Sequence, residues 1–250
     1  MSSFVNIAAA PWRLVNRIRR ALYRAGVLKA KKLPKPVISI GNLAAGGAGK
    51  TPLVIAIAEH LVARGKKVAI LTRGYGAMDE PLLIKKRVPK ADVIVGSNRY
   101  ENGLAVNCDV YLLDDGFQHL QLHRDLDIVI DVDDALVYRE GRSALRDAGL
   151  VIPRTVRTDA AKLRGKRVVA FAGIANNRQF FDTLRDAGAE VVSTREFPDH
   201  HHYQPGDVPE GDVVVTTEKD AVKLGRDDII AVRLDFVVPD AVFAAIDALV

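Results

Sequence analysis

The stretch VISIGNLAAGGAGKTP, residues 37–52, decides the fold. Residues 37–40 are rich in β-branched side chains and predict a buried strand. The glycines of 46–49 predict a tight loop, and apolar residues at helical spacing predict a helix over 52–64. A strand, a glycine-rich loop and a helix in this order form a phosphate-binding loop, so we expect a nucleotide site here. The alternative is a chance glycine-rich turn.

The residue types of this loop suit a bound triphosphate. Glycines let backbone N–H groups approach phosphate oxygens without a Cβ in the way, and the positive end of the following helix faces the same anion. Lys50 can bridge the β- and γ-phosphates of ATP, and the Thr51 hydroxyl can bind Mg²⁺. The strict spacing of such loops has a glycine at position 44, where this chain has alanine. The predicted nucleotide-binding residues are Gly46, Gly47, Ala48, Gly49, Lys50, Thr51 and Pro52.

Short apolar runs alternate with helical segments on both sides of the loop. Most of the runs are continuously apolar, as expected for parallel strands buried on both faces. We therefore predict an α/β fold, with a parallel sheet domain like that of phosphate-loop NTPases and a second, smaller α/β domain. The predicted strands are 37–40, 67–71, 92–95, 110–113, 126–130, 167–171, 191–193, 212–216 and 229–234, and further helices are expected at 177–187 and 239–249.

Charge and composition divide the chain further. Residues 1–35 hold nine basic and no acidic side chains, so with a net charge of +5 the rest carries −4. A polar stretch at 155–164 suggests a boundary. The predicted organisation is a basic arm at 1–35, a kinase core at 36–155 and a smaller domain at 156–250. Because the excess of basic over acidic side chains is confined to the arm, a nucleic-acid partner is not expected. The single cysteine excludes an intrachain disulfide framework and fits a reducing compartment.

The arm reads as an amphipathic helix over 11–28. Its apolar residues follow three- and four-residue spacing, with arginines mostly between them, and no uncharged apolar run of about 18 residues exists to span a bilayer. We expect residues 11–32 to contact an anionic membrane surface. The alternative is a helix packed on its own domain. The apolar residues are Trp12, Val15, Ile18, Leu22 and Ala25.

A pair of carboxylates ends a predicted buried strand. Asp114 and Asp115 follow residues 110–113, and a strand tip beside the loop would place Asp114 near the Mg²⁺ bound by Thr51. Paired carboxylates repel each other without a cation, which favours a bound metal. We assign Asp114 to the metal and Asp115 to the catalytic group with Lys50. The alternative is an ordinary Asp-Asp-Gly turn.

With these motifs in order, the sequence resembles the tetraacyldisaccharide 4'-kinase family. The resemblance implies an ATP- and Mg²⁺-dependent enzyme that phosphorylates the 4'-hydroxyl of a tetraacyl glucosamine disaccharide 1-phosphate. It also implies two α/β domains joined by a small β linker, and peripheral binding at the cytoplasmic face of the bacterial inner membrane. No obligate protein partner is implied. The matching segments are 39–43, 46–52, 72–76, 79–83, 114–119, 171–174, 197–201 and 217–223.

The resemblance also implies residue roles. Asp79 matches the proposed general base, and His200 matches the histidine that pairs with it. Read without the family, Asp79 could be a solvated loop residue and residues 200–202 a surface or weak metal-binding histidine tract. Gln118 is assigned to the nucleotide, and residues 218–220 either cap a helix or serve function. The substrate contacts are assigned to Arg73, Tyr75, His119, Arg146 and Asp147.

Two functional alternatives remain at this point. A phosphate-loop fold does not name its acceptor, so a cytosolic nucleotide switch or small-molecule kinase is possible. The second alternative is a catalytically weak nucleotide-binding variant. Only Ala77 and Met78 separate Gly76 from Asp79, which is fewer residues than is usual in the family.

Overall fold

The computed structural model describes residues 10–44, 47–74, 78–132 and 138–250. These residues form two compact units. The larger unit comprises Met1–Gly74, Val88–Thr155 and Phe236–Val250, and the smaller comprises Tyr75–Arg87 and Val156–Asp235. Each unit is built around a parallel sheet, which confirms the predicted fold class.

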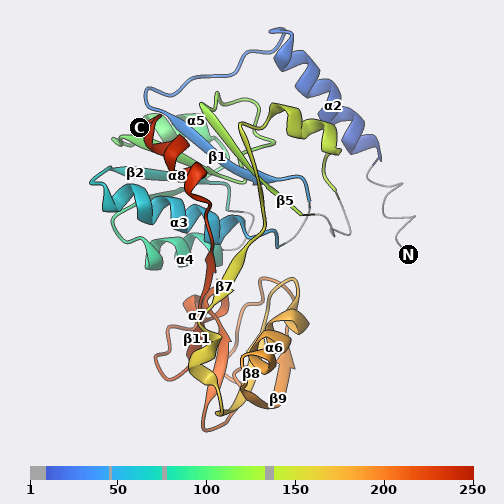
Figure 1. Ribbon diagram of the computed structural model, residues 1–250, viewed down its shortest axis with the longest axis vertical. Coiled ribbons are helices and arrows are strands. Elements are labelled where there is room, and N and C mark those ends of the chain that lie inside the picture. Colours follow the sequence, from blue (N-terminus) through green and yellow to red (C-terminus); the bar gives the residue numbers. More distant parts are fainter. Residues whose placement is uncertain (1–9, 45–46, 75–77, 133–137) are drawn as a thin grey trace. The chain divides into compact units, whose positions relative to one another are not determined.

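The larger unit has a six-stranded sheet in the order β3-β2-β4-β1-β5-β6 (Figure 1), and every neighbouring pair in it is parallel. Its central strands are buried on both faces, as their continuous apolar sequences predict. The edge strand β6 ends at Pro153, a position that tolerates a missing N–H. The strands are β1 (Val37–Asn42), β2 (Val68–Thr72), β3 (Asp92–Val95), β4 (Val110–Asp114), β5 (Leu126–Asp131) and β6 (Leu150–Pro153).

Strand order creates the place for a ligand in this sheet. From β1 the chain crosses to β2, and from β4 it crosses to β5, so β1 and β4 are neighbours whose connections leave in opposite directions. Open parallel sheets bind ligands at the carboxyl ends of such a pair. Ile40 of β1 is paired with Asp114 of β4, so the phosphate loop and the carboxylates leave adjacent strand ends. The helices of this unit are α2 (Ala10–Arg24), α3 (Lys50–Ala63), α5 (Arg99–Leu104) and α8 (Asp240–Asp247), with a 3₁₀ turn η1 (Arg142–Asp147).

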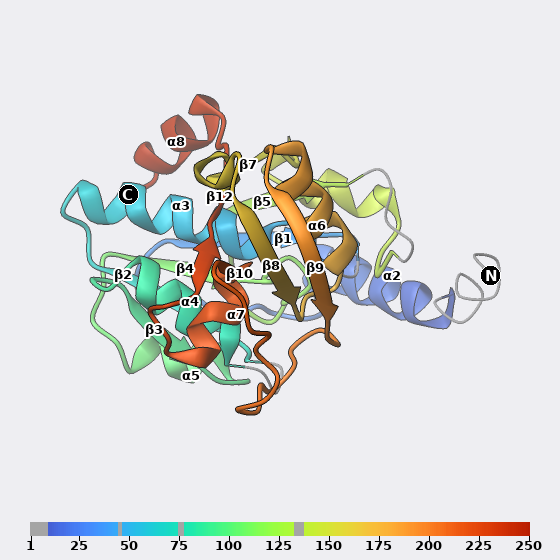
Figure 2. The ribbon, with the colours of Figure 1, turned by 90° about the horizontal axis from the view of Figure 1, so that it is seen from below.

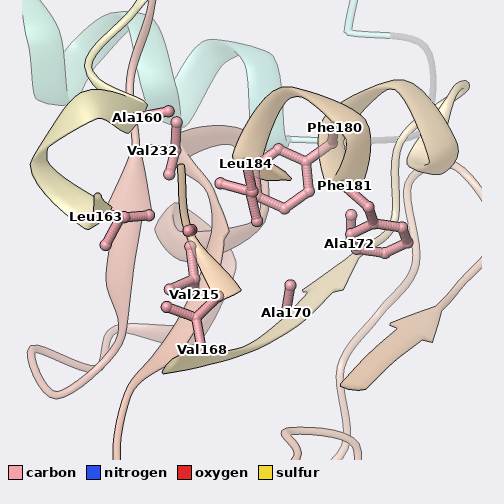
Figure 3. Packing of buried hydrophobic residues seen from close by; sticks show 11 residues of the cluster. Ala160, Leu163, Val168, Ala170, Ala172, Phe180, Phe181, Leu184, Val215 and Val232 are labelled. Carbon is pink, nitrogen blue, oxygen red and sulfur yellow. The ribbon is translucent and has the colours of Figure 1, made fainter. Parts of the chain in front are cut away.

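The smaller unit has a parallel sheet in the order β11-β10-β8-β9, and α6 lies against β8 and β9 (Figure 2). Phe180, Phe181 and Leu184 of α6 pack on the alanines and valine of β8 (Figure 3). The elements are α4 (Asp79–Arg87), β7 (Val156–Thr158), η2 (Ala160–Leu163), β8 (Arg167–Ala172), α6 (Asn177–Asp186), β9 (Glu190–Glu196), β10 (Val214–Thr217), α7 (Glu218–Leu224), β11 (Ile230–Val232) and β12 (Leu234–Phe236).

One predicted strand, 229–234, is divided in the structure. Residues 230–232 pair with β10 as β11, whereas β12 pairs with β7 in a separate two-stranded sheet. Arg233 separates them, and its N–H donates to Asp159 Oδ1 at 2.8 Å instead of continuing the ladder. Strand propensity alone cannot reveal this change of partner.

The compact units differ from the predicted domain boundaries in two segments. Helix α4 belongs to the smaller unit, where it packs on α7. Helix α8 belongs to the larger one, where Phe243 stacks on His60 with ring centroids 4.1 Å apart and Asp247 pairs with the same imidazole at 2.8 Å. The basic arm is not separate either, because Arg20 is buried against the larger unit. Long-range side-chain contacts decide these boundaries, and a linear reading does not contain them.

Candidate active site

The phosphate loop has the backbone that a phosphate cradle needs. Gly49 immediately precedes α3 with φ 87°, a left-handed conformation that favours glycine. Ala48 is buried, and Ala44, at the position of the strict motif's first glycine, accepts a hydrogen bond from the Asn42 side chain at 2.9 Å. The backbone of Ala44 does not adopt a positive φ, so alanine fits at position 44. Gly46, also predicted to bind nucleotide, lies outside the described residues.

The loop and the Asp-Asp-Gly segment come together, and the carboxylate that meets Lys50 is Asp115. Lys50 Nζ lies 3.6 Å from Asp115 Oδ1 and donates to Asn42 Oδ1 at 3.2 Å. Asp115 has φ 50°, a left-handed conformation that aspartate tolerates, and it is followed by Gly116. The Asp-Asp-Gly segment is thus a turn, and the turn directs Asp115 toward the lysine of the loop.

Arginines complete the electrostatics of this turn, and the sequence analysis did not assign them. Arg139 donates to Asp115 Oδ2 at 2.8 Å, and the buried Arg99 donates to the Asp114 carbonyl at 2.8 Å. Burial alone raises the pKa of Asp115, but the charges of Lys50, Arg139 and Arg99 outweigh it and hold that pKa below its usual range. Asp115 is therefore ionised at neutral pH. No short motif links residues 99 and 139 to the loop, so spacing could not have revealed them.

The oxygen atoms near the strand ends fit a hard cation. Asp114 is buried, and the Thr72 hydroxyl donates to its Oδ2 at 3.1 Å. Within the described residues, Asp115 Oδ1 and Gln118 Oε1 are buried oxygens that accept no hydrogen bond. Carboxylate, hydroxyl and amide oxygens are the ligands that Mg²⁺ prefers, directly or through water. Thr51, in the first turn of α3, is the predicted hydroxyl ligand.

Gln118 and His119 follow the turn, and Gln118 is held against β1. The Gln118 side chain donates to the Asn42 carbonyl at 2.9 Å. A Cβ at Gly41 would lie 2.5 Å from the Cβ of Phe117, so only glycine lets this segment approach the strand so closely.

Burial, and then the charges of Arg99, Arg124, Arg73 and Arg19, lower the pKa of His119 to about 4. His119 is therefore neutral at pH 7 in a positively charged surrounding, as a site for an anionic ligand requires.

The low pKa of His119 predicts a pH-dependent stability. The unfolded chain takes up this proton near pH 6.5, whereas the folded chain resists it until about pH 4. The free energy of unfolding should therefore fall as the pH drops from 6.5 to 4. We expect His119→Gln to flatten that slope in urea unfolding measured across this range. The exposed His123, changed to Gln, is the control and should leave the slope unchanged.

The other predicted substrate residues are dispersed. Arg73 directly follows β2 and is exposed, and Tyr75 lies outside the described residues. Arg146 donates to the Ser143 carbonyl at 2.8 Å within η1. Asp147 Oδ2 accepts from Arg20 at 3.2 Å and from Arg24 at 3.0 Å, which gives it an anchoring role between η1 and α2, the adjacent segments of Figure 1. A substrate contact stays a prediction for each of these residues.

The second predicted centre lies in the smaller unit, where Asp79 and His200 are in contact. His200 Nδ1 lies 2.9 Å from Asp79 Oδ2 and 3.1 Å from Oδ1. Asp79 is only 2% exposed and opens α4, where the Glu80 N–H donates to its Oδ1 at 3.0 Å. Asp79 is thus not the solvated loop residue of the alternative. The histidine tract is divided as well, because His201 pairs with Asp207 at 2.8 Å.

Two lysines face Asp79 from α7. The Thr217 hydroxyl caps the start of this helix by accepting the Asp220 N–H at 3.1 Å, and Gly225 at φ 59° ends it. Residues 218–220 therefore form the first turn of the helix, as the structural alternative predicted, and the cap itself is Thr217. Lys219 Nζ lies 3.7 Å from Asp79 Oδ2 and Lys223 Nζ lies 3.9 Å from it, one helical turn apart on the same face.

Comparison with known proteins shows the family of the chain. The family model for tetraacyldisaccharide-1-P 4'-kinase matches residues 1–142 and 137–250, which together are the whole chain. The chain belongs to the tetraacyldisaccharide 4'-kinase family. It is accordingly an enzyme, a phosphotransferase, and the predicted family resemblance is confirmed.

The relatives and the solved structure cover nearly the same extent. A tetraacyldisaccharide 4'-kinase of Geobacter metallireducens is 36% identical over 88% of this chain and 87% of its own. One of Anaeromyxobacter dehalogenans is 38% identical over 87% and 80%. The crystal structure of the tetraacyldisaccharide 4'-kinase LpxK from Aquifex aeolicus in complex with ATP superposes with a TM-score of 0.85 and 29% identity over 99% of both chains. The Geobacter alignment spans 295 positions, more than the 250 residues here, so that kinase has residues without a counterpart in this chain.

Proposed function

We propose that this kinase transfers the γ-phosphoryl group of ATP to the 4'-hydroxyl of a tetraacyl glucosamine disaccharide 1-phosphate. The observation that carries the proposal is the meeting of Lys50 with Asp115 at adjacent strand ends, directly behind a glycine-rich loop. The names of the relatives supply the acceptor, and the ATP complex of the Aquifex protein supplies the donor.

Each unit contributes its own chemistry to the transfer. In the larger unit, the loop amides and Lys50 bind the β- and γ-phosphates and stabilise the charge that develops during transfer. Thr51 and Asp114 would hold Mg²⁺, which supplies charge neutralisation on the phosphate oxygens. Asp115 keeps the ammonium of Lys50 in place before the nucleotide binds.

In the smaller unit, Asp79 takes the proton of the acceptor hydroxyl, and His200 orients the Asp79 carboxylate.

The acceptor assignment is tested by transfer of label from γ-labelled ATP. The protein is incubated with Mg²⁺ and the purified tetraacyl disaccharide 1-phosphate in detergent, and lipid-bound label is measured. We expect label in the lipid only when the disaccharide is present. Release of free phosphate at the same rate with and without lipid would instead favour the nucleotide switch, and no turnover at all would favour the weak binding variant.

We further propose that α2 rests on the cytoplasmic face of the inner membrane. The helix contacts its own unit through polar residues, because Asn16 and Arg20 are buried, while Leu14, Val15 and Ile18 are 58%, 47% and 50% exposed. A helix that docks by its polar side and presents its apolar side outward suits a membrane interface. Packing on its own domain therefore leaves Val15 and Ile18 of the predicted stripe exposed, with Leu22 half-buried. Among the residues that the structure covers, no helix is both long and apolar enough to cross a bilayer.

A single substitution tests the membrane proposal more cleanly than truncation. Deleting residues 1–33 would also remove Arg20 and Leu33, both buried in the fold. We expect Ile18→Glu to reduce flotation with vesicles containing anionic phospholipid about tenfold. The variant loses an apolar side chain that would be buried in the membrane interface, and it adds a negative charge. Val192→Glu, at a site 45% exposed in the smaller unit, is the matched control and should float as the unaltered protein does. Equal flotation of both variants would contradict the proposal.

A further inference from the structure

A second ion pair, formed by a buried carboxylate and a half-buried lysine, lies next to Asp79. Asp220 of α7 has no exposed surface, and Lys223 Nζ lies 2.7 Å from its Oδ1. The same ammonium lies 3.9 Å from Asp79 Oδ2 and 4.9 Å from the centre of the Tyr203 ring. Lys223 is therefore shared between two buried carboxylates, and one of them is the proposed base.

Asp220 reaches the histidine of the pair by another route. Its Oδ2 accepts the Gly173 N–H at 2.9 Å, and the Gly173 carbonyl accepts the His200 N–H at 3.2 Å. His200 has φ 61°, a strained conformation for a residue other than glycine, so it depends on such backbone contacts to stay in place. Lys223 thus contacts Asp79 directly, and Asp220 is linked to the backbone of His200 through Gly173.

The remaining charged groups around Asp79 have partners of their own. Lys219 contacts Glu80 at 3.6 Å and Asp199 at 3.1 Å as well as Asp79. Burial alone lowers the pKa of Lys219, but these three carboxylates outweigh it and raise that pKa, so Lys219 stays charged. Burial and the neighbouring Asp220 raise the pKa of Tyr203, which stays a neutral phenol. Lys223 is therefore the cation that the two buried carboxylates share with each other.

We propose that Lys223 and Asp220 are positioning residues that set the proton affinity and the orientation of the Asp79–His200 pair. The inference rests on the proposed function, in which this pair receives the proton of the acceptor hydroxyl. A nearby cation favours an ionised carboxylate, and a nearby carboxylate disfavours it. The two members of the ion pair therefore act on Asp79 with opposite signs, and a purely structural role has no such signature.

The test is the pH profile of kcat for phosphoryl transfer in full-length variants. Lys223→Met should shift the acidic limb of the profile to higher pH by about one unit, because Asp79 loses a cation and keeps a carboxylate neighbour. Asp220→Asn should shift the same limb to lower pH, because the Lys223 charge then acts on Asp79 alone. Lys223→Arg should restore the limb toward its original position. Lys86→Met, at an exposed lysine of α4, is the matched control and should not move it.

A second readout does not depend on activity. The imidazole of His200, assigned with a His200→Gln variant, can be titrated by NMR in each protein. Its midpoint should rise in Lys223→Met and fall in Asp220→Asn. If the unaltered protein transfers no phosphoryl group, the proposed function fails, while the titration still tests the inference. An unchanged midpoint, or shifts of the same sign in both variants, would overturn it.

Discussion

Lys50→Ala is expected to lower kcat for phosphoryl transfer by about 10²- to 10³-fold and to weaken the binding of MgATP. The ammonium group of Lys50 lies between the Asn42 side chain and Asp115, at the strand ends where the triphosphate is expected. Truncation removes the charge that stabilises the transferring phosphate oxygens in the ground state and more strongly in the transition state. The Asp115 carboxylate also loses one of the cations that lower its pKa.

Initial rates and calorimetric titration with MgATP measure the two effects of Lys50→Ala. Lys90→Ala, an exposed lysine of the same unit, is the control and should match the unaltered protein in both assays. A Lys50→Ala variant with full activity would remove the phosphate loop from the mechanism.

Asp79→Asn is expected to lower kcat by about 10²- to 10⁴-fold and to leave MgATP binding unchanged. Asparagine keeps the shape of the buried side chain and its contact with His200, but it cannot accept the proton of the acceptor hydroxyl. Because Asp79 and Lys50 belong to different compact units, the nucleotide-binding residues remain intact.

The two substitutions should therefore differ in kind, and the same pair of assays shows it. Glu80→Gln alters the neighbouring, more exposed carboxylate and should retain most of the activity. Equal loss of MgATP affinity in Asp79→Asn and Lys50→Ala would argue against a base role for Asp79.

Much of the fold was predictable because its signals are local. Continuous apolar runs predicted strands such as β1 and β4, and the glycine-rich segment before Lys50 predicted the loop between β1 and α3. Their adjacency in the sheet follows from a strand order that no local pattern contains. For the same reason α4 and α8, each assigned by its place in the chain, belong to units other than those expected.

The site was predictable where one motif carries the chemistry. The loop lysine and the carboxylates after β4 were expected to meet, and the contact is made by Asp115. Asp79 and His200, 121 positions apart, were paired only through the family resemblance. The buried Arg20 and Arg99 and the half-buried Lys223 were missed as partners, because an arginine or a lysine in a sequence reads first as a surface charge. The paired spacing of Lys219 and Lys223 on one helix face was the one available signal, and it named no partner.

The most direct test of the central claim is the position of the new phosphate on the lipid product. The protein is incubated with ATP, Mg²⁺ and the tetraacyl disaccharide 1-phosphate, and the purified product is examined by ³¹P–¹H correlation NMR. We predict two phosphate monoesters, the original one at position 1 and a new one coupled to the 4' proton, formed by the unaltered protein and absent with Lys50→Ala. A lipid that returns with only its original phosphate while ATP is consumed, or a new phosphate at another hydroxyl, would contradict the account.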